Sequence, residues 1–335
     1  MFWLEIAVLS RLDLMKEQIS ADLECESVFG RLLHPNSESV KDPKLYGNLM
    51  VAYIELMRPK NLVLGALTVP LGAAFILRGD IADELLIISL QTMTVMFFIG
   101  AGNVMNDIKD YEIDKLAHPN RPLPSGQLSL QSANTFSRLL WAASILCLAI
   151  AILFSMDFEL WWATILIYVI AVVLMVSYDH GPTTKEMGLQ GNIAISIMVA
   201  AVIIYGASSV GGLLNPLIWW VSGVVFFTNL AREIVKDCQD IIADEGQRTT
   251  LPMKIGLENS RMVAYVVLMA ALVCLYMPFW RGPFEFGQLV FQTPAILALI
   301  TLNGPLFKGD DALVAGRIRA AMLLGLIGFI LPMLM

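Results

Sequence analysis

The sequence contains two short acidic motifs whose residue types and spacing could support chemistry. The members of each motif follow one another at intervals of four, three and four residues, which places them all on one face of a helix. The first motif comprises Asn103, Asp107, Asp110 and Asp114, with Asn106 one turn before Asp110. The second motif, 130 residues further along the chain, comprises Glu233, Asp237, Asp240 and Asp244.

Carboxylates crowded on one helix face repel one another, and their cost rises near hydrocarbon. Divalent cations relieve this repulsion, and hard oxygen ligands suit Mg²⁺, which binds one or two carboxylates together with substrate phosphates. Lys and Arg residues beside both motifs indicate that an anion accompanies the metal. The residues therefore predict a bound Mg²⁺–diphosphate. A solvated helix end with i, i+4 ion pairs, such as Lys236 with Asp240, would explain one motif but not two at matching positions.

Each motif is followed by a loop that contains Arg, Pro and Gly. The loop residues are Arg121, Pro122, Pro124 and Gly126 after the first motif, and Arg248, Pro252 and Gly256 after the second. The recurrence of a helix and its loop at a fixed interval indicates an internal duplication, with four membrane spans in each repeat.

The composition predicts a protein that crosses a membrane several times. Of the 335 residues, 57% are hydrophobic and 15% are charged, and the mean hydropathy is +0.69. A soluble domain of this length cannot enclose so many apolar side chains, which excludes a soluble globular enzyme, a disordered chain and a fibrous repeat. The net charge of −7 argues against a nucleic-acid partner.

Nine apolar runs are long enough to cross a bilayer as helices. They lack the alternation typical of a membrane β-barrel, so the predicted fold class is an all-α polytopic membrane protein. We expect Pro294 to interrupt the eighth span. The expected spans are residues 53–77, 85–106, 134–155, 158–178, 190–210, 214–235, 259–279, 287–303 and 317–335.

The loops after the even-numbered spans hold most of the cations. The opposite loops contain Arg78 and Arg281. Under the positive-inside rule the cation-rich side faces the cytoplasm, and since both acidic motifs lie on that side, we expect a cytoplasmic functional site. The cations on this side are Lys109, Lys115, Arg121, Lys185, Arg232, Lys236, Arg248, Lys254, Arg261, Lys308, Arg317 and Arg319.

Residues 1–50 are polar and mixed in charge, unlike the rest of the chain. Apolar residues near helical spacing predict an amphipathic surface helix over residues 1–19, and a loosely ordered cytosolic tail is the alternative. The expected organisation is thus a polar N-terminal segment, residues 1–50, and a nine-helix domain, residues 51–335.

At these motifs the sequence resembles the UbiA family of intramembrane prenyltransferases. The family's pattern Asn-xxx-Asp-xxx-Asp matches Asn106, Asp110 and Asp114, and its Asp-xxx-Asp pattern matches Asp240 and Asp244. The resemblance extends over the whole nine-span region. It implies a nine-helix bundle with a cytoplasm-facing cavity, and Mg²⁺-dependent transfer of a prenyl group from an allylic diphosphate to a lipophilic acceptor within the bilayer.

Some stretches look closest to the ether-lipid synthases of that family, which transfer a geranylgeranyl group to geranylgeranylglyceryl phosphate. These are Gly102 to Lys115, the loop from Asn120 to Gly126, and Arg232 to Asp237. The first stretch is also similar to the family's tetrapyrrole-prenylating branch. The resemblance thus implies a role in phospholipid synthesis, with prenylation of an aromatic quinone precursor or a tetrapyrrole, or terpene cyclisation, as alternatives.

The resemblance also implies roles for single residues. Arg58 and Asn61 match the family's Arg-Pro-xx-Asn entry to the first span, while Tyr178 and Lys185 match a Tyr and Lys segment after the fourth. The implied metal ligands are Asn106, Asp110, Asp114, Asp240 and Asp244, with Asn103, Asp107 and Asp237 as further candidates. The implied catalytic residues are Asp107, Asp110, Asp237, Asp240 and Lys185. The implied substrate-binding residues are Arg58, Asn61, Tyr178, Lys185, Arg121, Arg232, Lys236, Arg248 and Lys254, of which Arg121, Arg248 and Lys254 are available to an acceptor phosphate.

A different class, an ion-coupled transporter, is also consistent with intramembrane acids and internal repeats. Transporters place their sites near the bilayer midplane on broken helices, whereas these acids lie at span ends. Diphosphate release that depends on Mg²⁺ and needs no ion gradient distinguishes the two classes.

Overall fold

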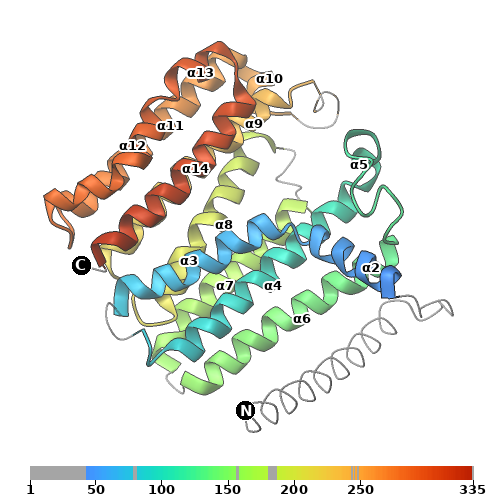
Figure 1. The fold of residues 1–335 in the computed structure, drawn as a ribbon, viewed down its shortest axis with the longest axis horizontal. Coiled ribbons are helices and arrows are strands. Elements are labelled where there is room, and N and C mark those ends of the chain that lie inside the picture. Colours follow the sequence, from blue (N-terminus) through green and yellow to red (C-terminus); the bar gives the residue numbers. More distant parts are fainter. Residues whose placement is uncertain are drawn as a thin grey trace, which may run out of the picture. The chain divides into compact units, whose positions relative to one another are not determined.

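The computed structural model describes residues 43–77, 81–155, 158–179, 187–242, 244, 246 and 249–333. These residues form helices joined by loops, without strands (Figure 1). Nine helices among them are long and apolar enough to cross a membrane, which confirms the predicted fold class and number of spans. The predicted helix over residues 1–19 lies outside the described residues.

The spans follow the predicted runs closely. In chain order, the helices with eight or more residues are α2 (Pro43–Leu56), α3 (Pro59–Leu77), α4 (Leu85–Lys109), α6 (Leu130–Ser155), α7 (Phe158–Asp179), α8 (Leu189–Ser208), α9 (Pro216–Gln239), α11 (Leu257–Trp280), α12 (Thr293–Ile300) and α14 (Asp311–Ile330). The shorter elements are α5 (Tyr111–Ala117), α10 (Leu251–Ile255), η2 (Phe286–Gln292), α13 (Asn303–Lys308) and η3 (Leu331–Met333).

The largest differences from the prediction are at the first, eighth and ninth spans. The first span begins at Pro59 rather than at residue 53, because the chain breaks between α2 and α3. The eighth span is interrupted near Pro294, as predicted: it consists of η2, α12 and α13, with Pro294 in the first turn of α12, where its missing N–H costs nothing, and it ends at Lys308 rather than at residue 303. The ninth span begins at Asp311, six residues before the predicted start at 317.

The chain divides into two compact units. The first contains Asn103–Leu139 and the described residues up to Arg58, and the second contains Pro59–Gly102 and the residues from Leu140 onward. In the first unit the rings of Tyr53 and Phe136 pack with centroids 4.8 Å apart, and burial raises the pKa of the Tyr53 hydroxyl. The division of the sequence at residue 50 stays a prediction.

The core of the second unit is built around α9. This helix packs against α8, α11 and α14, while α3 packs against α8 and α12 lies beside α14 (Figure 1). Ile203, Ile218, Val221 and Phe329 are fully buried in this core. Burial of apolar side chains between helices excludes lipid and fixes the position of α9, which carries the second acidic motif.

Polar side chains within the spans of the second unit bond to one another. The Ser144 hydroxyl on α6 donates to the Thr94 carbonyl oxygen on α4 at 2.9 Å and lies 2.9 Å from the Tyr168 hydroxyl on α7. The hydroxyls of Thr164 and Ser208 are also 2.9 Å apart and link α7 to α8. Such bonds satisfy groups that hydrocarbon would leave without partners.

The backbone supports the internal duplication that the motifs predict. Arg58, just before α3, has a φ of 56°, and Gly188, 130 residues later and just before α8, has a φ of 64°. Gly126 and Gly256, in the loops after the two motifs, are also 130 residues apart and have φ values of 76° and 86°. Positive φ is ordinary for glycine, so the informative position is Arg58, and its match with Gly188 is consistent with a repeated unit.

Glycines allow α3 and α8 to approach each other closely. A Cβ atom on Gly72 would lie 2.3 Å from the Ile203 carbonyl oxygen, and one on Gly206 would lie 2.2 Å from the Val69 carbonyl oxygen. Both obstructions are backbone atoms, so no side-chain rotation relieves them. Small residues at helix contacts are a common basis of packing in membranes.

We expect Gly206→Ala to destabilise the second unit by about 1–3 kcal/mol, the usual cost of overpacking. The thermal midpoint of the purified protein in detergent measures this change. Gly316→Ala on α14 is the matched control, because nothing lies within 4 Å of its Cβ position and Ala favours a helix interior. Equal midpoints for the two variants would contradict the close approach.

Candidate functional site

The first acidic motif follows the end of α4 into α5. Helix α4 ends at Lys109, and Asp110 has φ −85° and ψ 8° at the start of α5. The Asp110 N–H donates to the Asn106 carbonyl oxygen at 2.9 Å, and the Asp114 N–H donates to the Asp110 carbonyl oxygen at 2.8 Å. Because this i, i+4 bonding continues through the junction, the acids keep the spacing predicted for a continuous helix.

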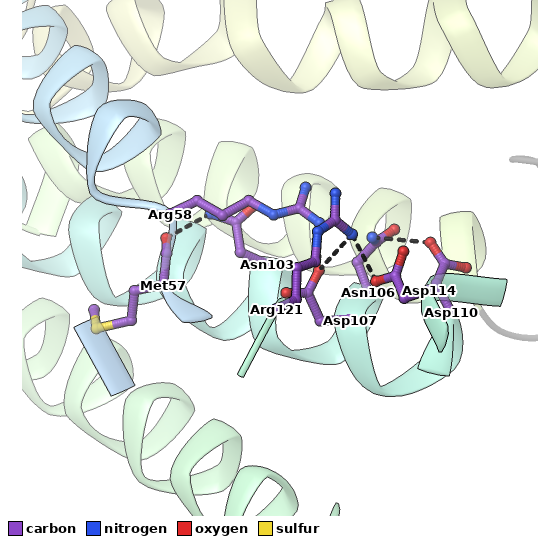
Figure 2. A network of polar contacts seen from close by, with 8 residues as sticks. All are labelled: Met57, Arg58, Asn103, Asn106, Asp107, Asp110, Asp114 and Arg121. Carbon is purple, nitrogen blue, oxygen red and sulfur yellow. Dashed lines mark hydrogen bonds and ion pairs between the residues drawn. The ribbon is translucent and has the colours of Figure 1, made fainter. Parts of the chain in front are cut away.

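Two arginines hold the carboxylates of the first motif (Figure 2). Arg58 forms an ion pair and a hydrogen bond with Asp107. Arg121 donates from Nη1 to Asp114 Oδ2 at 2.6 Å, and the same nitrogen lies 4.0 Å from Asp107 Oδ1. Asp107 and Asp114 are only 5% and 4% exposed, so these pairs supply the compensation that buried carboxylates require.

The side-chain amides of Asn103 and Asn106 each donate a hydrogen bond beside the first motif. The Asn103 amide donates to the Met57 carbonyl oxygen at 2.8 Å, and the Asn106 amide donates to Asp110 Oδ2 at 3.1 Å (Figure 2). The bond from Asn103 fixes the turn in which Arg58 adopts its positive φ. Such a conformation is costly for a non-glycine residue and persists only where its surroundings enforce it. Arg58 is thereby directed at Asp107.

The second motif has the same backbone geometry. Helix α9 ends at Gln239, and Asp240 has φ −97° and ψ 9°. The Asp240 N–H donates to the Lys236 carbonyl oxygen, and the Asp244 N–H donates to the Asp240 carbonyl oxygen, both at 2.9 Å. The burial also matches, since Asp237 and Asp244 are buried and Asp240 is half-buried, like their counterparts in the first motif.

The partners of the second motif are different. The Asn192 amide on α8 donates to Asp237 Oδ2 at 2.7 Å. Glu233 accepts from Arg232 Nη1 at 2.6 Å and from Lys236 Nζ at 2.8 Å. On α9, one amide and two neighbouring cations thus hold Asp237 and Glu233. Arginines from outside the helices hold Asp107 on α4 and Asp114 on α5.

The remaining predicted site residues are more scattered. Asn61 is exposed in the first turn of α3, Tyr178 is half-buried near the end of α7, and Lys254 is exposed on α10. Lys185 and Arg248 lie outside the described residues. Near the first motif, a hydrogen bond to Glu112 raises the pKa of the Lys115 ammonium.

The donor set of each motif fits a hard divalent cation that a substrate shares. Among the described residues no three acidic, His or Cys side chains gather as a self-sufficient metal site. Each motif instead offers carboxylates next to basic side chains, and Mg²⁺ in phosphate-binding sites needs only one or two carboxylates from the protein. The arrangement therefore fits a metal ion bound together with a phosphorylated ligand.

Comparison with known proteins establishes the family. The model of the UbiA prenyltransferase family matches residues 66–309, which include both acidic motifs. The chain belongs to this family. It is therefore a membrane prenyltransferase with several spans, and its resemblance to the family in sequence is confirmed.

The chain is also similar to curated members of the family. It is 33% identical over 298 residues to the digeranylgeranylglyceryl phosphate synthase of Methanococcus aeolicus, covering 84% of this chain and 98% of the relative. The synthase of Methanoculleus marisnigri is 30% identical over 281 residues, covering 80% of this chain and 90% of the relative. The enzyme is thus similar to these synthases.

Solved structures share the fold. A structure of a digeranylgeranylglyceryl phosphate synthase superimposes with a TM-score of 0.67 at 24% identity, covering 85% of this chain and 98% of the other. A UbiA homologue from Archaeoglobus fulgidus, solved with GPP and Mg²⁺ bound, gives a TM-score of 0.60 at 17% identity, covering 82% and 99%. These matches confirm the all-helical architecture.

The predicted site residues did not include Glu233 as a binding residue, or Asn192. Glu233 occupies the position in the second motif that Asn103 occupies in the first. Asn103 binds the Met57 carbonyl oxygen, whereas Glu233 binds Arg232 and Lys236. Asn192 lies 45 residues from Asp237, and the signal for it in the sequence is an amide in the first turn of an otherwise apolar span.

We expect Asn192→Ala to lower both thermal stability and turnover. The variant removes the amide that holds Asp237, and losing a buried hydrogen-bond partner costs about 1–3 kcal/mol. The thermal midpoint and the initial rate of prenyl transfer measure the two effects. Asn134→Ala is the control, because the exposed Asn134 amide bonds the Leu130 carbonyl oxygen of its own helix. Equal losses in both variants would contradict a specific role for Asn192.

Proposed function

We propose that this enzyme transfers a geranylgeranyl group from geranylgeranyl diphosphate to geranylgeranylglyceryl phosphate, in a Mg²⁺-dependent step of ether-lipid synthesis. The observation that carries the proposal is the pair of acidic motifs with matching backbone geometry, matching burial and adjacent cations. The similarity to digeranylgeranylglyceryl phosphate synthases over most of both chains supports this donor and acceptor.

In this proposal each motif holds one Mg²⁺ ion. Asn106, Asp110 and Asp114 serve the first ion, and Asp240 and Asp244 serve the second. Asp107 and Asp237 lie on the same helix faces and are further candidate ligands or catalytic bases. When bound, the metal supplies positive charge that stabilises a diphosphate leaving group.

The cations of the chain bind and orient the substrates. In this proposal Arg58, which forms an ion pair with Asp107, donates to phosphate oxygens of the donor. Asn61 and Lys185 complete the proposed diphosphate-binding group, with Arg232 and Lys236 as further candidates and Tyr178 as a pocket residue. Arg121, Arg248 and Lys254 are the cations proposed from sequence for the acceptor phosphate.

The reaction breaks the allylic C–O bond of the donor and forms a new C–O bond to a glycerol hydroxyl of the acceptor, whose proton passes to a base. Apolar helix surfaces exclude water, which would otherwise capture the allylic cation. We propose a carboxylate of the motifs as this base, with Asp107 and Asp237 as the candidates. The cation-rich loops beside the motifs support a cytoplasmic location for this chemistry.

Asp110→Ala and Asp240→Ala are each expected to abolish transfer, with a loss of at least about a hundredfold, the usual scale of a lost electrostatic contribution. Both side chains are half-buried at helix junctions, so the variants should still insert and fold. Product formation from radiolabelled geranylgeranyl diphosphate measures the effect. Asp83→Ala, an exposed acid in the turn before α4, is the control. Wild-type turnover in either motif variant would refute the metal assignment.

Chelation should abolish activity reversibly. Treating the purified enzyme with EDTA is expected to stop transfer, and added Mg²⁺ should restore it, because the carboxylates and diphosphate share the ion. The thermal midpoint measured with a prenyl diphosphate present should fall on chelation, since bound ligands stabilise the folded state. An EDTA-treated enzyme that keeps full activity would rule out metal dependence.

The acceptor itself is tested by product mass. The purified enzyme is incubated with geranylgeranyl diphosphate and separately with geranylgeranylglyceryl phosphate, an aromatic quinone precursor and a tetrapyrrole. We expect a product only with the glyceryl phosphate. A product with another acceptor would keep the enzyme class and overturn this assignment, while hydrolysis or cyclisation without any acceptor would favour a terpene cyclase.

A further inference from the structure

A hollow lies at the ends of the spans opposite to the second acidic motif, and the proposed reaction does not use it. Its volume is about 490 Å³, within the range of small-molecule sites. It is bordered by the start of α9, the turn after α11, and the elements η2 and η3. At a rise of about 1.5 Å per residue, Asn215 in its lining lies roughly 33 Å from Asp237 along α9.

One part of the lining is apolar and firmly packed. Phe75 and Leu217 are buried there, and Phe284 is half-buried. The centroid of the Phe284 ring lies 5.3 Å from that of Phe279 and 6.1 Å from that of Phe329. Because these rings hold one another in place, they present a fixed apolar surface to an occupant of the hollow.

Two opposite charges line the hollow on a tight turn. Arg281 follows the end of α11 and Glu285 precedes η2, and both residues are exposed. A Cβ atom on Gly282 would lie 2.6 Å from the Pro278 carbonyl oxygen, and the Phe284 N–H donates to the same oxygen at 3.3 Å. The turn therefore packs back against α11, which fixes the backbone from which both charged side chains extend.

The two charges do not neutralise each other. Among the described residues no ion pair joins Arg281 to Glu285. The Arg281 guanidinium lies 4.9 Å from the centre of the Trp280 ring, and the Glu285 carboxylate accepts a hydrogen bond from the Gln288 N–H. The lining thus offers one cation and one anion and has no net charge. A ligand that complements both carries a negative and a positive group.

Neutral hydrogen-bond donors lie in the same lining. The Asn215 side-chain oxygen accepts from the Leu217 N–H, and the Gln288 side-chain oxygen accepts from the Glu285 N–H, both at 3.0 Å. The amide nitrogens of Asn215 and Gln288 therefore remain as donors, and the indole N–H of the half-buried Trp220 is a third. Donors combined with an arginine suit the oxygens of a phosphate.

The hollow lies where membrane spans end. Helix α3 ends at Leu77, α9 begins at Pro216 and α11 ends at Trp280. Trp219 and Trp280 are 52% and 58% exposed, as in the aromatic belts at the boundary between hydrocarbon and headgroups. An occupant at this level comes from the layer of lipid headgroups, and the apolar part of the lining suits the start of its acyl chains.

We propose that this hollow binds the headgroup of a zwitterionic aminophospholipid from the leaflet at this end of the spans. The phosphodiester accepts hydrogen bonds from Arg281, Asn215 and Gln288. The ammonium lies against the Glu285 carboxylate and the face of the Trp220 ring, since aromatic faces attract cations. One negative and one positive group match the charges of the lining, whereas an anionic headgroup would leave Glu285 without a counterpart.

The test is binding of phosphatidylethanolamine to the purified full-length protein in detergent, measured by native mass spectrometry. We expect Arg281→Gln to raise the apparent Kd about tenfold, the scale of one lost hydrogen bond to a charged group. Lys308→Gln is the matched control, because Lys308 is an exposed cation at the other end of the eighth span. It should leave the Kd within about twofold of wild type, because an exposed charge away from the ligand contributes little.

Glu285→Gln tests the second charge separately. Its amide oxygen can still accept from the Gln288 N–H, so the capping box and the turn are kept. We expect wild type to prefer phosphatidylethanolamine over phosphatidylglycerol by about two- to fivefold, the scale of an exposed ion pair, and Glu285→Gln to lose this preference. Glu258→Gln is the control and should keep it, because Glu258 is an exposed acid in the first turn of α11, at its other end.

Three results would overturn the proposal. The first is an equal Kd for phosphatidylethanolamine in wild type and in an Arg281→Gln protein whose thermal midpoint shows that it is folded. The second is a preference for phosphatidylethanolamine that is absent from wild type or unchanged in Glu285→Gln, which decides the question even where Arg281→Gln does not fold. The third is displacement of the lipid by glycerophosphoethanolamine, which has the headgroup without acyl chains and would identify a soluble ligand instead.

Discussion

The cost of placing carboxylates at the ends of membrane helices governs the local structure of both motifs. An ionised carboxylate that leaves water loses several kcal/mol of hydration, which only a close partner offsets. Asp107 is therefore paired with Arg58, Asp114 with Arg121 and Asp237 with Asn192. The requirement extends to the backbone, since Arg58 reaches Asp107 from a left-handed turn that Asn103 helps to fix.

The two motifs share a backbone geometry, but different side chains bind their acids. Asp110 and Asp240 have nearly the same φ and ψ, and each connects to the residues four before and four after it by the same hydrogen bonds. Arginines hold the first set of acids, whereas an amide and adjacent cations hold the second. The two motifs thus keep the backbone geometry of their acids and differ in the side chains that bind them.

The sequence predicts the spans and the acidic faces well because both depend on local spacing. Apolar runs set the nine helices, and the interval of four, three and four residues survives at Asp110 even though α4 ends one residue earlier. The interruption of the eighth span at Pro294 was also predictable, because proline is tolerated in the first turn of a helix and is disfavoured in its interior, and α12 begins there. The break before Pro59, by contrast, depends on Arg58, whose conformation is set by contacts with α4.

Side-chain contacts between different helices cannot be predicted from local spacing. Nothing in the spacing of α8 connects Asn192 to an acid 45 residues away. This contact depends on how α8 packs against α9, which apolar side chains such as Ile218 determine.

This difference bears on how the family diversifies. In the proposed function the acidic motifs serve the diphosphate leaving group, which does not depend on the acceptor. Selection of the acceptor must then come from residues outside the motifs. A phosphorylated acceptor requires cations that the leaving group does not already occupy, and an aromatic or neutral acceptor would leave such cations unpaired at a cost.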